Sequence, residues 1–160
     1  MSINIKEAAP PDSLTSLYER DFYGWIERNV SAIREGRVHE VDWANVAEEL
    51  EDMGKSERRG LRSQLARLMS HLLKWSYQPE RRRISEYSWR ATTEHARQSI
   101  SELLNESPSF KPQLSQLLLK AYRDAVAETV AQTNLPKRTF PTDCPWTFNQ
   151  MMAEDFWPDQ

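Results

Sequence analysis

Apolar residues recur every three or four positions along most of the chain, which is the spacing of one face of an α-helix. Four long segments carry this pattern. They lie at about residues 13–36, 42–76, 85–105 and 109–135. We therefore expect an all-α fold, an antiparallel bundle of about four main helices in which the second helix is the longest.

Local signals refine the ends of these helices. Ser13 is a favourable N-cap for the first helix, and Gly36 can close it in the left-handed conformation. Pro79 should end the second helix, because the residue before a proline avoids the helical conformation. Thr147 is followed three residues later by Gln150, which is the spacing of a capping box and predicts a short C-terminal helix over about 147–155.

The long second helix contains one irregular stretch, with the sequence GKSERRG between Gly54 and Gly60. Glu57 interrupts the apolar stripe there, and each glycine costs about 1 kcal/mol relative to alanine inside a helix. These features predict a bend or a break. It could be a hinge, although a point where another helix crosses closely is the favoured interpretation.

The two ends of the chain differ in character. Residues 1–12 have no helical periodicity and include two adjacent prolines, so we expect a flexible N-terminal arm before a single helical domain over 13–160. The tail is rich in aromatic residues, each worth about 1.5–3 kcal/mol when buried. They predict a strap across the bundle, or across a second subunit: Phe140, Trp146, Phe148, Phe156 and Trp157.

The composition indicates the cellular compartment expected for the protein. Cys144 is the single cysteine, which excludes a disulfide within the chain and a thiolate-rich zinc site. No signal peptide and no apolar run of about 18 residues is evident. We therefore expect a cytoplasmic protein that does not associate with a membrane.

Charge is unevenly distributed although the net charge is only −3. Residues 40–52 carry six acidic and no basic side chains, and residues 55–97 carry eleven Lys or Arg against four Glu. Antiparallel helices could neutralise each other, or the basic residues could form a face for nucleic acid or an acidic partner. The candidate nucleic-acid-binding residues, three of them on an expected exposed loop, are Lys55, Arg58, Arg59, Arg62, Arg81, Arg82 and Arg83.

Four segments together resemble a known family. They are LYERDFYGWIERN, VDWANVAEELEDMGKSERRGLRSQLARLMSHLLKWSYQPERR, SWR and FPTDCPWTFNQMMAEDFWP. Over about residues 17–158 the chain resembles the bacterial domain-of-unknown-function family 29. The resemblance implies a small, mostly helical bacterial protein. It implies no activity and no catalytic residue.

One cluster could carry acid–base chemistry. If the second and third helices fold back on each other, His71 should lie near Arg90 and Glu94. Histidine titrates near neutrality and can act as an acid or a base. The alternative is a histidine held by a hydrogen bond between helices, beside Leu72 and Trp75, both of which belong to apolar stripes, as does Trp89.

Other candidates for chemistry are weaker. Glu48 and Asp52 share a helix face, but on a straight helix Asp52 lies about 28 Å from His71, so we predict no metal site and no cofactor. Cys144 would need a nearby base or a helix N-terminus to become a nucleophile, and a buried tail residue is the favoured interpretation. His39 is expected in a turn and His95 on an exposed face.

These observations favour a non-enzymatic interaction or regulatory protein that acts through protein–protein contacts and associates with itself. Nucleic-acid binding through residues 55–83 and an enzyme built on His71, Arg90 and Glu94 are the two alternatives. The sequence leaves any small-molecule ligand unknown.

Overall fold

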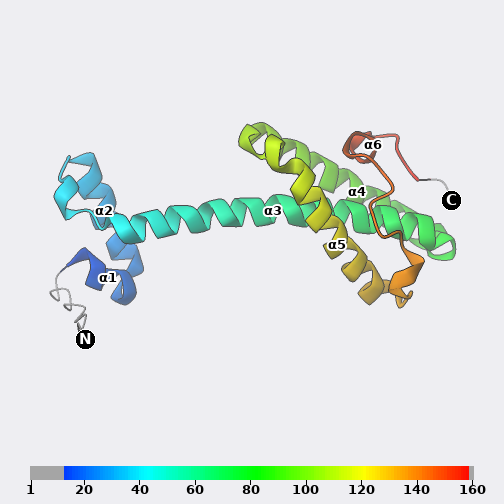
Figure 1. The fold of residues 1–160 in the computed structure, drawn as a ribbon, viewed down its shortest axis with the longest axis horizontal. Coiled ribbons are helices and arrows are strands. Elements are labelled where there is room, and N and C mark those ends of the chain that lie inside the picture. The colour runs from blue at the N-terminus through cyan, green and yellow to red at the C-terminus, as the bar shows by residue number, and fades with distance from the viewer. Residues whose placement is uncertain (1–12, 159–160) are drawn as a thin grey trace, which may run out of the picture. The chain divides into compact units, whose positions relative to one another are not determined.

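A computed structural model describes residues 13–158, so the arm predicted at 1–12 lies outside the described residues. The described part contains α-helices and short 3₁₀ helices and no β-strand (Figure 1), which confirms the all-α prediction. None of its helices is long and apolar enough to cross a membrane. The helices are α1 Leu14–Arg20, α2 Phe22–Arg34, η1 Val38–Glu40, α3 Trp43–Tyr77, α4 Pro79–Glu106, η2 Pro108–Gln113, α5 Leu114–Thr133, η3 Lys137–Thr139 and α6 Phe148–Met152.

The chain divides into two compact units, residues 1–55 and 56–160, which we call the N-terminal and C-terminal units. The N-terminal unit contains α1, α2, η1 and the start of α3. The C-terminal unit contains the rest of α3 and all later helices. The single domain expected over residues 13–160 stays a prediction.

In the N-terminal unit the predicted first helix is two helices. Asp21 leaves the helical conformation, with φ −151° and ψ 81°, and its carboxylate caps α2 by accepting the Gly24 N–H at 3.0 Å. A Cβ at residue 24 would lie 2.4 Å from that carboxylate, so glycine permits this cap. Ser13 caps α1 and Gly36, at φ +73°, follows the end of α2, as predicted.

Polar contacts join α2 to the start of α3. The Trp25 indole donates to the Asp42 carboxylate at 3.1 Å, and the buried Asn29 side chain accepts the Asp42 N–H at 2.9 Å. Tyr18 stacks edge-on against Trp25 and donates its hydroxyl to Glu49 at 2.5 Å, a bond that raises the pKa of Tyr18 to about 12. These contacts fix α1, α2 and the first turns of α3 as one unit.

The break expected between Gly54 and Gly60 is wrong, because α3 is one continuous helix. Apart from the backbone of α3 itself, no atom of residues 13–158 lies within 4 Å of a Cβ placed on either glycine, so none of the described helices crosses closely there either. The residues between them are good helix formers, and Lys55 pairs with Asp52 one turn earlier at 2.9 Å. Such pairs and propensities offset the cost of two glycines.

In the C-terminal unit the later part of α3, α4 and α5 pack against one another. Their apolar stripes meet in one core, whose fully buried members include Leu61, Leu65, Leu68, Met69, Leu72, Leu73, Ile100 and Leu117. The loop expected after Pro79 is wrong, because α4 begins at Pro79 itself. Proline suits the first turn of a helix, where its missing N–H costs no hydrogen bond.

The aromatic tail lies on the core of the C-terminal unit. Phe140 and Met151 are buried, and the ring centroids of Trp157 and of Trp75 on α3 lie 4.2 Å apart. Arg97 of α4 is 5% exposed and donates to the main-chain carbonyls of Met151, Glu154 and Phe156 at 2.8, 3.2 and 2.7 Å. The predicted capping box of Thr147 and Gln150 starts α6.

Candidate interaction site

Two of the three residues of the hypothetical catalytic cluster, His71 and Arg90, make contacts apart from each other. His71 contacts the Arg67 carbonyl on its own helix, and Arg90 donates to Glu86 at 3.0 Å while stacking on Trp75 and Trp157. Among residues 13–158 no hydrogen bond or ion pair joins His71 to Arg90 or Glu94. A catalytic role for the three therefore stays a prediction without a supporting contact.

His71 instead belongs to a polar chain that the sequence analysis missed. Its Nδ1–H donates to the Arg67 carbonyl at 3.0 Å, which leaves Nε2 to accept from the buried Lys74 ammonium at 3.5 Å. Lys74 also donates to Gln132 at 2.9 Å, and Gln132 donates to Glu128. Burial and the charge of Lys74 lower the pKa of His71, and burial lowers the pKa of Lys74.

This arrangement predicts a loss of stability in mild acid. The folded state disfavours protonated His71, whereas the unfolded chain takes up the proton near the usual pKa of about 6.5. The free energy of unfolding should therefore fall as the pH drops below about 6.5, towards the lowered pKa of the folded state. Urea titrations at pH 7.5 and 5.5 measure this fall. His71→Gln should reduce this fall in stability, whereas His95→Gln, on the exposed side of α4, should leave the fall unchanged. An equal fall in the wild type and both variants contradicts the role given to His71.

The proposed nucleic-acid-binding residues are partly engaged within the chain. Arg62 forms two bonds with Asp124 at 2.5 and 2.7 Å, Lys55 pairs with Asp52, and Arg82 lies over the Trp75 ring. The five whose side chains make no hydrogen bond or ion pair with another described residue are Arg58, Arg59, Arg81, Arg82 and Arg83, and Arg82 has its ring contact alone. Arg81 to Arg83 lie on α4 and not on a loop. Nucleic-acid binding stays a prediction.

Metal binding and a reactive thiol gain no support from the geometry. Residues 13–158 contain no group of three or more His, Cys, Asp or Glu placed to hold a metal ion. Cys144 is half-buried, and burial raises the pKa of its thiol, which donates to the Trp146 carbonyl at 3.4 Å. Three residues separate Cys144 from the start of α6 at Phe148, so no helix N-terminus activates it.

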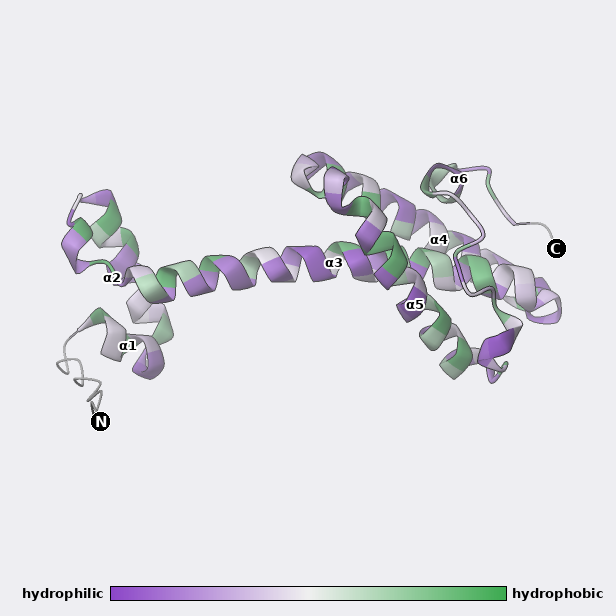
Figure 2. Ribbon diagram, in the orientation of Figure 1, coloured by the Kyte–Doolittle hydropathy of each residue, from purple (hydrophilic) through white to green (hydrophobic). Residues whose placement is uncertain are grey.

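The N-terminal unit exposes an unusual amount of apolar surface. Twelve large hydrophobic side chains of the described residues are exposed, and nine of them lie between Phe22 and Met53. The apolar face predicted for residues 14–33 is only partly buried: α2 buries Trp25 but exposes four others, namely Phe22, Ile26, Val30 and Ile33. Figure 2 shows green, hydrophobic positions along α2 and the start of α3. Concentrated apolar exposure of this kind marks interaction surfaces.

A second apolar stripe follows the start of α3. Trp43, Leu50 and Met53 are 54, 62 and 64% exposed, and Val46 lies between them. Their spacing of three, four and three residues places them on one side of the helix. The Trp43 indole donates to the Val38 carbonyl at 2.9 Å, which holds the ring in place. We call these four residues the α3 stripe.

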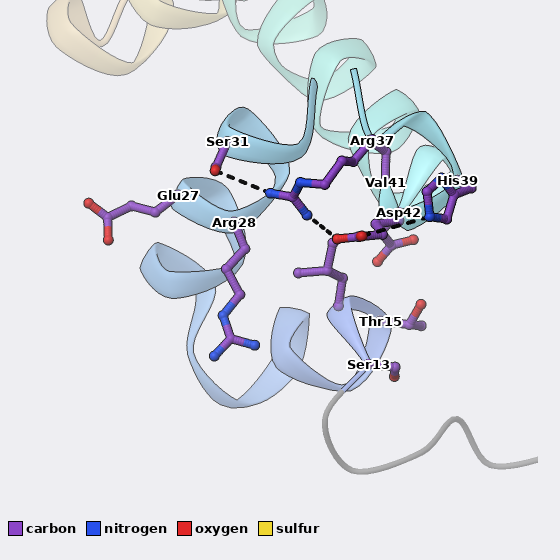
Figure 3. A pocket seen from close by; sticks show the side chains of 11 residues that line it. Ser13, Thr15, Glu27, Arg28, Ser31, Arg37, His39, Val41 and Asp42 are labelled. Carbon is purple, nitrogen blue, oxygen red and sulfur yellow. Dashed lines mark hydrogen bonds and ion pairs between the residues drawn. The ribbon is translucent and has the colours of Figure 1, made fainter. Parts of the chain in front are cut away.

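The N-terminal unit also has a charged pocket of about 750 Å³ (Figure 3). Arg37 contacts Ser31 and Glu40 on its wall and pairs with Glu35 at 2.9 Å, and His39 lies 3.7 Å from Glu40. The Asp42 carboxylate already accepts from Trp25 and Asn45. These charged groups hold the turn around η1, whereas nine large apolar side chains between Phe22 and Met53 are exposed.

Comparison with known proteins gives a family and no activity. No curated protein and no solved structure matches the chain. A family model matches residues 17–157, nearly the whole chain. The chain therefore belongs to the family described as domain of unknown function DUF29.

Proposed function

We propose that the protein is an interaction or regulatory protein that acts through protein–protein contacts, and that its first contact is with a second copy of itself through the α3 stripe. The observation that carries this proposal is the exposure of Trp43, Leu50 and Met53 on one helix face. We place these contacts in a bacterial cytoplasm, on the strength of the sequence resemblance and the single unpaired cysteine.

The sequence spacing along α3 supports a helix pair. Apolar or small residues occupy positions 43, 46, 50, 53 and 60, with Glu57 between the last two, so the intervals alternate between three and four. This is the heptad spacing of residues in the seam of a coiled coil. A symmetric dimer uses the same surface on both copies, and one such stripe on each copy suffices for it.

Size and charge favour an antiparallel pair. If Leu50 of one copy lies beside Met53 of the other, Trp43 lies level with Gly60, so the largest side chain meets the smallest. A parallel pair would instead set Glu57 against Glu57 and Gly60 against Gly60, which combines like-charge repulsion with a gap. The antiparallel alignment also sets the acidic residues 40–52 beside residues 51–63, which contain four basic and three acidic side chains.

Self-association should depend on Leu50. Leu50→Asp places a carboxylate in the seam of both copies, so we expect the dimer dissociation constant to rise about 100-fold. Sedimentation velocity over a concentration series measures the constant. Because Leu50 is exposed in the single chain, the helical circular dichroism of the monomer should not change.

Ile84→Asp is the matched control, because Ile84 is 88% exposed on α4 and lies outside the α3 stripe. Its dissociation constant should equal that of the wild type. The proposal is contradicted if the wild-type protein stays monomeric at all concentrations. It is also contradicted if both substitutions raise the dimer dissociation constant equally.

A further inference from the structure

The C-terminal unit contains a pocket of about 440 Å³ beside α5, which is within the size range of small-molecule sites. Its apolar wall comes from three parts of the unit: Met69 of α3, Leu118 and Tyr122 of α5, and Trp146 and Met151 of the tail. Met69, Tyr122 and Met151 are buried residues of the core. The pocket therefore has a fixed apolar floor.

A second pocket of about 600 Å³ adjoins the first and shares Tyr122, Arg123 and Thr142 with it. The second pocket differs in charge, because Arg123, Lys137 and Arg138 line it together with no acidic residue. Because the two pockets share Tyr122, Arg123 and Thr142, we treat them as one site with an apolar end and a cationic end. We call it the α5 hollow.

Contacts within the unit hold the boundary of the hollow in place. The Tyr122 hydroxyl donates to the Pro141 carbonyl at 2.8 Å, which ties α5 to the chain after η3. By contrast, the side chains of Arg123, Lys137 and Arg138 make no hydrogen bond or ion pair with any residue in 13–158. Asp143 is the one acidic residue that lines the hollow, at its apolar end. The cationic end is thus free to bind an anion.

We propose that the α5 hollow binds a small amphipathic anion, with an aliphatic chain or ring against Leu118, Trp146 and Met151 and a carboxylate or phosphate at Arg123. An apolar group leaves water on entering the first pocket, and a guanidinium binds carboxylate and phosphate oxygens through two parallel hydrogen bonds. Neither half of the ligand alone uses both ends of the hollow.

Cys144 provides the readout, because it lies on the wall of the apolar pocket and is the single cysteine of the chain. A bound ligand should slow its alkylation by a maleimide. The full-length protein is treated with the maleimide in the presence of dodecanoate or dodecyl phosphate, each below its micellar concentration. Parallel reactions contain dodecanol or inorganic phosphate instead. Calorimetric titration gives the affinities.

Both amphipathic anions should slow alkylation, and dodecanol and inorganic phosphate should do so only at concentrations at least tenfold higher. Arg123→Gln should weaken binding about tenfold, since one charge-assisted contact is lost. Lys120→Gln is the matched control, because Lys120 is exposed on α5 and lines neither pocket. Its affinity should be unchanged.

Ser115→Phe tests the apolar end, because exposed Ser115 lines that pocket and a phenyl ring there would fill it. This variant should lose protection by dodecanoate. Three results would each overturn the proposal. The first is equal protection of Cys144 by dodecanol and dodecanoate, and the second is an equal loss of affinity in Arg123→Gln and Lys120→Gln. The third is binding to anionic phospholipid vesicles without any binding of the monomeric amphiphiles.

Discussion

Replacing Arg97 with methionine is expected to lower the free energy of unfolding by about 3 kcal/mol. The guanidinium is buried and donates to three carbonyls of the tail, at Met151, Glu154 and Phe156. Methionine fills a similar volume but supplies no donor, so these carbonyls lose their partners and the tail loses its attachment to α4. Urea denaturation followed by circular dichroism measures the change.

Arg83→Met is the matched control, because Arg83 is exposed on the same helix. It should change the stability by no more than about 0.5 kcal/mol. Arg97→Lys keeps the charge but cannot reproduce the planar set of guanidinium N–H donors. Its free energy of unfolding should therefore lie between those of the wild type and Arg97→Met. Equal stability of the Arg83 and Arg97 methionine variants contradicts the role given to Arg97.

Trp157→Ala is expected to destabilise the protein by about 2 to 3 kcal/mol. The Trp157 ring lies 4.2 Å from the Trp75 ring, and the guanidinium carbons of Arg90 and Arg97 lie 4.5 and 5.3 Å from its centroid. Alanine removes the aromatic surface and both cation–π contacts. Urea denaturation again gives the measurement, with Tyr87→Ala, at a side chain 88% exposed, as the near-neutral control.

Arg97 and Trp157 hold the same segment, so their effects should not add. The double variant Arg97→Met with Trp157→Ala should lose less stability than the two single losses together, because one substitution already releases the tail. Strict additivity would show that the two side chains stabilise independent parts of the unit.

Periodicity predicted the helical fold well, because most apolar stripes pack within the chain and local caps fix several ends. Ser13, Gly36 and the Thr147–Gln150 box act where the sequence placed them. The division at Asp21 and the start of α4 at Pro79 were not predicted. In both places one residue can either interrupt or begin a helix, and tertiary packing decides which.

The candidate sites were harder to predict than the fold. An apolar stripe on a helix does not reveal whether the same chain covers it, so the exposure of Ile26, Leu50 and Met53 could not be read from the pattern. The spacing of His71 and Lys74 by three residues could have suggested their contact. Their joint burial beside Gln132 depends on how α5 packs, which periodicity does not specify.

Disulfide formation between two single-cysteine variants tests the antiparallel α3 dimer most directly. Leu50→Cys and Met53→Cys are each made in a Cys144→Ser background, mixed and oxidised, with Ile84→Cys as the control for random collision. We expect the mixed 50–53 cross-link to form fastest and to dominate. Cross-links mainly between two copies of the same variant, or no cross-link faster than that of Ile84→Cys, would contradict it.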